Sequence, residues 1–156
     1  MTRKLPLSAY YKIKDPKHYY TAMHSDIQLL HENGRYTTCM TVIMCCFDAL
    51  AAGKGEASAG KFTAFAEKYF PKLCAGLASV VRGKTGAQVL YDKFRNGLCH
   101  LRSTKSGFGL AEDHELCGKY TGEIEINGKK KFIAVNIQRL IKDFLVLLKH
   151  FEKGAP

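Results

Sequence analysis

The chain has 156 residues, of which 46% are hydrophobic and 24% are charged. This length suits one domain with a core of its own, and this composition excludes a disordered or fibrous chain. The 24 lysines and arginines exceed the 14 aspartates and glutamates, which gives a formal net charge of +10. This excess favours RNA, DNA or an acidic protein as partner. Cations spread along a chain are equally typical of a solvated surface.

The first half of the chain predicts helices separated by short breaks. Asp15-Pro16 is a typical helix start, in which an N-cap acceptor precedes proline, and Asn33-Gly34 is a typical helix end. The next apolar repeat is hydrophobic on more than one side, which indicates a central, buried helix. An aromatic stripe before Pro71 predicts another helix. The expected helices cover about 16–33, 36–52 and 59–70, with a further short helical piece at 72–82.

The second half predicts a long helix, a β-hairpin and a last helix. Asn127-Gly128 is a strong hairpin signal between two short strands. Asn136 is the expected N-cap of the last helix, in which apolar residues repeat at helical spacing. The expected ranges are 85–102 for the long helix, 103–109 for a polar, glycine-containing loop, 119–126 and 129–135 for the strands, and 137–151 for the last helix.

These elements predict a mainly all-α domain. We expect an up-down helical bundle of four to five helices, with a small β-hairpin before the last helix. The single domain would span residues 1–156, with its core at about 16–152 and a short basic N-terminal arm.

The six cysteines, at 39, 45, 46, 74, 99 and 117, do not predict a disulfide framework. Three of them lie in the apolar stretch of the second helix, where cysteine behaves as a small hydrophobe. The first residues contain no apolar run of the kind found in a secretory signal, and the most apolar stretch is too short to span a membrane. We therefore expect a cytoplasmic protein with reduced thiols and no membrane partner.

A polar cluster interrupts the long helix at Arg95, Asn96 and His100. At 3.6 residues per turn Asn96 and His100 share a face, and the long Arg95 side chain reaches the same edge. A guanidinium matches phosphate oxygens, an imidazole moves protons near neutral pH, and an amide orients its neighbours. This trio suits a phosphodiester. Since no carboxylate cluster accompanies it, we expect no metal or other cofactor.

The segment from Arg95 to His100 resembles the signature of the HEPN superfamily, an arginine and a polar residue followed by histidine in the pattern R-x4–6-H. Here four residues separate Arg95 from His100, and Asn96 fills the polar position. An aromatic-rich segment at 62–71 precedes the motif helix, and the last helix follows a short hairpin. The similarity covers about residues 16–152 at the level of helix order.

The resemblance implies a HEPN-like bundle that pairs as a homodimer and brings two motifs into one cleft. It also implies a metal-independent endoribonuclease that leaves 2′,3′-cyclic phosphate and 5′-hydroxyl ends. His100 would be the general base or acid, Arg95 would stabilise charge on the phosphate, and Asn96 would position groups. Arg102 and Lys105, just past the motif, are the expected auxiliary phosphate contacts.

The resemblance leaves the partner and the activity open. HEPN proteins occur in toxin–antitoxin pairs, phage defence and RNA processing, so an antitoxin or another protein partner is an expectation beside RNA. Other members are inactive. The alternative is a non-catalytic module of the same fold that binds RNA, a nucleotide or a protein, with Arg95 and His100 in a structural hydrogen-bond network.

Overall fold

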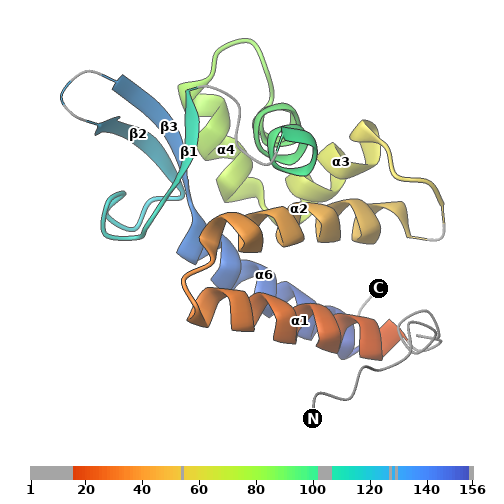
Figure 1. Ribbon diagram of the computed structural model, residues 1–156. Helices are drawn as coiled ribbons and strands as arrows, with labels where there is room; N and C mark the ends of the chain where they lie inside the picture. The colour runs from red at the N-terminus through yellow and green to blue at the C-terminus, as the bar shows by residue number, and fades with distance from the viewer. Residues whose placement is uncertain (1–15, 54, 102–106, 127, 129, 155–156) are drawn as a thin grey trace.

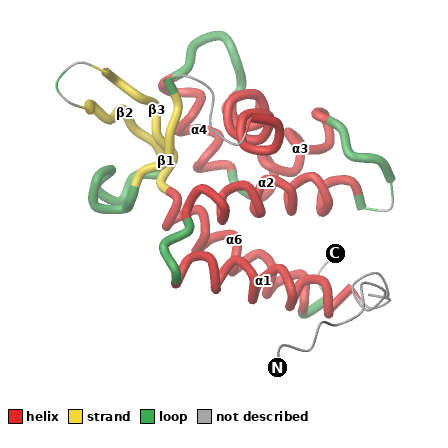
Figure 2. Tube along the Cα trace, viewed as in Figure 1, coloured by secondary structure: helices red, strands yellow, loops and turns green. Residues whose placement is uncertain are grey.

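The computed structural model describes residues 16–53, 55–101, 107–126, 128 and 130–154. It is mainly helical, as expected, with a small sheet at one end of the helices (Figures 1 and 2). The helices of the first half are α1 (Pro16–Glu32), α2 (Tyr36–Ala52), α3 (Ala59–Tyr69) and α4 (Pro71–Val80). The second half contains α5 (Gly86–Val89), η2 (Leu90–Arg95), η3 (Gly97–Leu101), β1 (Phe108–Ala111), β2 (Thr121–Ile126), β3 (Lys130–Asn136) and α6 (Ile137–Glu152).

Helix α2 is the centre of the helical layer. It packs against α1, α3, α6 and the motif helix, by which we mean residues 86–101. Phe47 of α2 is fully buried, and its ring lies 4.8–5.5 Å from those of four other phenylalanines, at 62, 65, 70 and 144. Helices α1 and α6 pack side by side across one face of α2 (Figure 1). The all-round hydrophobicity of the α2 sequence therefore corresponds to a helix covered on several sides.

The sheet has three strands in the order β1-β3-β2, one more than the expected hairpin. Strands β2 and β3 pair antiparallel, as the hairpin signal predicts, whereas β1 pairs parallel with β3 from Phe108↔Ile133 to Ala111↔Asn136. Phe108 and Gly109, which we expected in a loop, lie in β1. The loop prediction was wrong at these two residues because a parallel partner is remote in sequence and leaves no turn signal next to the strand.

The motif helix is continuous from Gly86 to Leu101, close to the expected range, but only its first turn is an ordinary α-helix. From Leu90 onwards most of it is wound as a π-helix, in which the backbone hydrogen bond joins residues five apart. One such bond runs from the amide of Asn96 to the carbonyl of Tyr91. The assumption of 3.6 residues per turn was therefore wrong across the motif.

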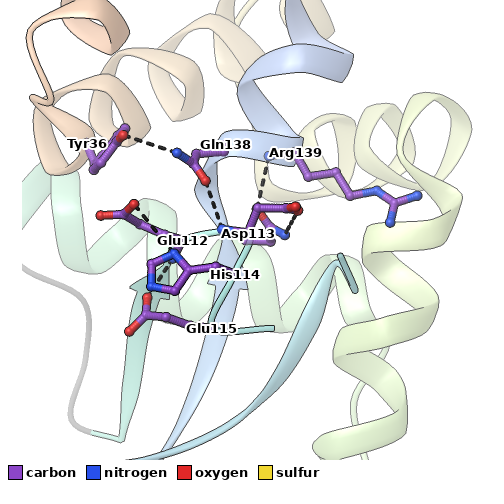
Figure 3. Close-up of polar contacts among 8 residues, drawn as sticks. Tyr36, Glu112, Asp113, His114, Glu115, Gln138 and Arg139 are labelled. Atoms are coloured by element: carbon purple, nitrogen blue, oxygen red, sulfur yellow. Dashed lines mark hydrogen bonds and ion pairs between the residues drawn. The ribbon is translucent and has the colours of Figure 1, made fainter. Parts of the chain in front are cut away.

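The segment between β1 and β2 is fixed on the start of α6 by polar contacts (Figure 3). The Asp113 amide donates to Gln138, whose own amide donates to the Tyr36 hydroxyl. Asn136 is fully buried: its amide donates to Asp113 and to the Lys119 carbonyl, and its oxygen accepts the Arg139 amide at the N-terminus of α6. The predicted N-cap is thus confirmed, and it also anchors the loop.

Asn136→Ala is expected to lower the free energy of unfolding by about 2–3 kcal/mol, because it removes the cap and leaves polar groups unpaired. Asn136→Ser is the matched variant: it keeps a cap acceptor and should recover about 1 kcal/mol of that loss. Urea denaturation of the three proteins measures both values. Equal stabilities of the alanine and serine variants would contradict the role of Asn136 as a cap.

Candidate functional site

Arg95 of the motif helix is held by an ion pair with Asp48 of α2. Its Nε donates to Oδ2 of Asp48 at 2.8 Å, and its Nη1 donates to the side-chain oxygen of Asn96 at 2.9 Å. The guanidinium also lies over the Tyr91 ring, 5.2 Å from the ring centroid. The Arg95 and Asp48 side chains are only 20% and 15% exposed. The cation is therefore oriented by a carboxylate, an amide and an aromatic face.

The ion pair stabilises the charged form of Arg95. Burial alone lowers the pKa of Arg95, but the hydrogen bond and the negative charge of Asp48 outweigh burial, so the net shift of this pKa is upward. The guanidinium consequently stays protonated across the physiological range.

The backbone hydrogen bond of a π-helix joins residues five apart, which is also the separation of Arg95 and His100 in the sequence. The main chain of His100 thus follows that of Arg95 by about one π turn. The side chain of His100, and all of Arg102 and Lys105, lie outside the described residues.

A shallow, open hollow of about 620 Å³ lies beside the ion pair. Arg95, Asp48, Cys45 and Cys99 line it, together with Tyr19 of α1. The rest of its wall is made of small residues from the end of α2 and the following segment: Ala49, Ala52, Gly53, Gly55 and Ala57. Small side chains keep this wall low, so a ligand larger than a water molecule has access to the edge of Arg95.

Asp48 and the pair of thiols are the site residues that the sequence reading missed. Asp48 lies within an apolar stretch of the sequence and is the only charged residue of α2. A charge in an otherwise buried helix needs a partner, so its sequence context did contain a signal. By contrast, no local pattern relates Cys45 to Cys99, because they meet only through the packing of α2 against η3.

A second polar hollow, of about 480 Å³, lies at the start of α6, and Arg139, Lys142 and Asp143 contribute to its lining. The Arg139 guanidinium lies 4.7 Å from the Tyr120 ring centroid and donates to the Gly118 carbonyl, and the Tyr120 hydroxyl donates to Asp143. These contacts tie the β1–β2 segment to α6. They explain the positions of the polar side chains without requiring a ligand.

Within the described ranges, no group of three or more His, Cys, Asp or Glu side chains is arranged to hold a metal ion. No helix in that part of the chain is long and apolar enough to cross a membrane. Comparison of the chain with models of protein families, with curated proteins and with solved structures finds no match.

Proposed function

We propose that the protein is a metal-independent endoribonuclease of the HEPN type, acting as a homodimer in a toxin–antitoxin pair or in defence. The observation that carries the proposal is the Arg95–Asn96 pair, oriented by Asp48 at the edge of an open hollow. The R-x4–6-H spacing supplies His100 about one π turn further along the backbone. A fixed guanidinium with an imidazole nearby in the chain suits phosphodiester cleavage.

In the proposed reaction His100 takes the proton of the RNA 2′-hydroxyl. The 2′-oxygen attacks phosphorus, the bond from phosphorus to the 5′-oxygen breaks, and that oxygen leaves as a hydroxyl after it receives a proton. The products are a 2′,3′-cyclic phosphate and a 5′-hydroxyl. Two copies of His100 in a paired cleft supply the base and the acid. Arg95 stabilises the negative charge that develops on the phosphate oxygens, and Asn96 holds Arg95 in place.

The second candidate is a non-catalytic module that binds RNA or a nucleotide. It is favoured by the same ion pair, because Asp48 already neutralises the charge of Arg95. An arginine held in this way also serves a structural network between α2 and the motif helix. The two candidates differ in what His100→Ala does, since only the enzyme needs an imidazole for a chemical step.

We expect the wild-type protein to cleave a mixed single-stranded RNA in excess EDTA, with 2′,3′-cyclic phosphate ends. His100→Ala and Arg95→Ala should each lower the rate by about 100-fold or more, because each removes a group that acts in the transition state. The measurement is the initial rate of cleavage at matched folding, checked by circular dichroism. Lys93→Gln, which removes another cation from the motif helix, is the control and should retain the activity.

Two results would reject the enzyme. One is the absence of cleavage by the wild type, and the other is equal residual cleavage by all the variants, which would indicate a contaminating nuclease. RNA binding that persists without cleavage, and weakens in Arg95→Ala but not in His100→Ala, would instead support the non-catalytic module.

A further inference from the structure

Cys45 of α2 and Cys99 of η3 bring two thiols into contact. Their Sγ atoms are 3.7 Å apart, although 54 positions separate the residues in the sequence. Cys45 is exposed and Cys99 is half-buried, and both line the hollow beside Arg95. Three of the other cysteines, Cys39, Cys46 and Cys74, are buried in the core. Cys45 and Cys99 are thus an accessible pair on two different elements.

We propose that Cys45 and Cys99 are a modification site, at which hydrogen peroxide converts the two thiols into a reversible disulfide. This inference does not depend on the proposed ribonuclease activity, because it rests on the distance and the exposure of the two sulfurs. It also goes beyond the expectation of reduced thiols, because it makes two of the cysteines the site of a reversible oxidation.

Formation of the disulfide requires only a small movement of the two sulfur atoms. A disulfide places its sulfurs about 2.05 Å apart, so the two Sγ atoms must approach each other by about 1.7 Å. Each sulfur is moved by rotation about its own Cα–Cβ bond, and the two elements that carry the residues already pack together.

The order of the two oxidation steps follows from the different exposures of Cys45 and Cys99. Solvent reaches Cys45 first, so its thiolate attacks peroxide, the O–O bond breaks, and a sulfenic acid and hydroxide form. The sulfur of Cys99 then attacks the sulfur of Cys45, the S–O bond breaks, and water leaves. In total, two thiols and one hydrogen peroxide give one disulfide and two waters, and the sulfurs lose the two electrons that the peroxide gains.

Cys99 reacts with peroxide more slowly than Cys45 in this scheme. Burial, together with the nearby Cys45, raises the pKa of Cys99 to about 11, and the charge of Arg95 offsets only part of this rise. The half-buried thiol therefore resists oxidation by itself. Its attack on the Cys45 sulfenic acid depends on the contact distance between the two sulfurs and not on the acidity of Cys99. The disulfide would tie α2 to the motif helix within four residues of Arg95.

The test is mass spectrometry of the full-length protein after hydrogen peroxide treatment. Trypsin releases Cys99 in peptide 96–102 and Cys45 in peptide 36–54. We expect these two peptides to be cross-linked, in a protein that stays monomeric on a non-reducing denaturing gel, and dithiothreitol to separate them again. Cys45→Ser should abolish the cross-link and leave the Cys99 thiol open to alkylation under denaturing conditions.

Controls distinguish this pair from general oxidation. Peptide 36–54 also contains Cys39 and Cys46, so Cys46→Ala must retain the cross-link. If Cys46→Ala does not fold, fragmentation of the cross-linked peptides in the mass spectrometer must assign the bond to Cys45 and not to Cys39 or Cys46. Cys117→Ser, which changes another exposed thiol, must also retain the cross-link. Covalent dimers in place of the internal bond, a cross-link that survives in Cys45→Ser, or two thiols that remain fully alkylatable after peroxide would each overturn the proposal.

Discussion

Gly86→Ala is expected to lower the free energy of unfolding by about 3 kcal/mol or more, which is a large fraction of the stability of a domain of this size. Gly86 is the first residue of α5 and is buried. A Cβ atom at this position would lie 1.7 Å from the carbonyl oxygen of Cys74 and 2.6 Å from its Cα. These are backbone atoms of α4, so a side-chain rotation cannot relieve the overlap. Either α4 or the motif helix must move.

Gly60→Ala is the matched control for this prediction. Gly60 lies in the first turn of α3, is exposed, and has no atom within 4 Å of the position of an added Cβ. Alanine favours a helix over glycine by up to about 1 kcal/mol, so this variant should be as stable as the wild type or slightly more stable. Urea denaturation of both variants measures the difference. Similar midpoints would show that α4 and the motif helix do not pack as closely as the structure has them.

The parts of the fold that the sequence could predict are those with local signals. Helices α1, α2, α3 and α6 carry their own signals, namely apolar residues at steps of three and four with typical residues at their ends. The predicted ranges agree with the observed bounds to within about one residue at most ends. Each of these signals is local, so it survives without knowledge of what the helix packs against.

The features that were missed depend on contacts between remote segments. Strand β1 forms by pairing parallel with β3, which is remote in sequence. Its four residues include a glycine and do not predict a strand by themselves. The π winding of the motif helix likewise leaves no periodic signal in so short a segment. For the candidate site, the sequence located Arg95, Asn96 and His100, but it could not show that Asp48, 47 positions earlier, contacts Arg95.

Asp48→Ala is expected to lower the free energy of unfolding by about 3 kcal/mol, because it leaves the guanidinium of Arg95 largely buried without its carboxylate. Arg95→Met in the same background removes the charge that Asp48→Ala leaves without its carboxylate, so the double variant should be more stable than Asp48→Ala alone. Urea denaturation of the wild type, the two single variants and the double variant gives the coupling energy of the pair directly.

Asp92→Ala provides the comparison on the same helix. Asp92 pairs with Lys84 at the surface, where the two side chains are 36% and 45% exposed, and water screens such a pair. Its loss should cost no more than about 0.5 kcal/mol. Equal costs for Asp48→Ala and Asp92→Ala, or effects of Asp48 and Arg95 that simply add, would contradict the assignment of a coupled, buried pair.

Asp48→Asn separates the structural role of this carboxylate from its effect on Arg95. The amide keeps the size of the side chain and one acceptor oxygen, so the fold should survive, while the guanidinium loses the charge that fixes it. If Arg95 acts on a phosphate in the transition state, the kcat for RNA cleavage should fall by about tenfold with little change in KM. A structural role alone would leave kcat unchanged in a folded Asp48→Asn protein. Asp48 would then stabilise the helix packing without positioning Arg95 for chemistry.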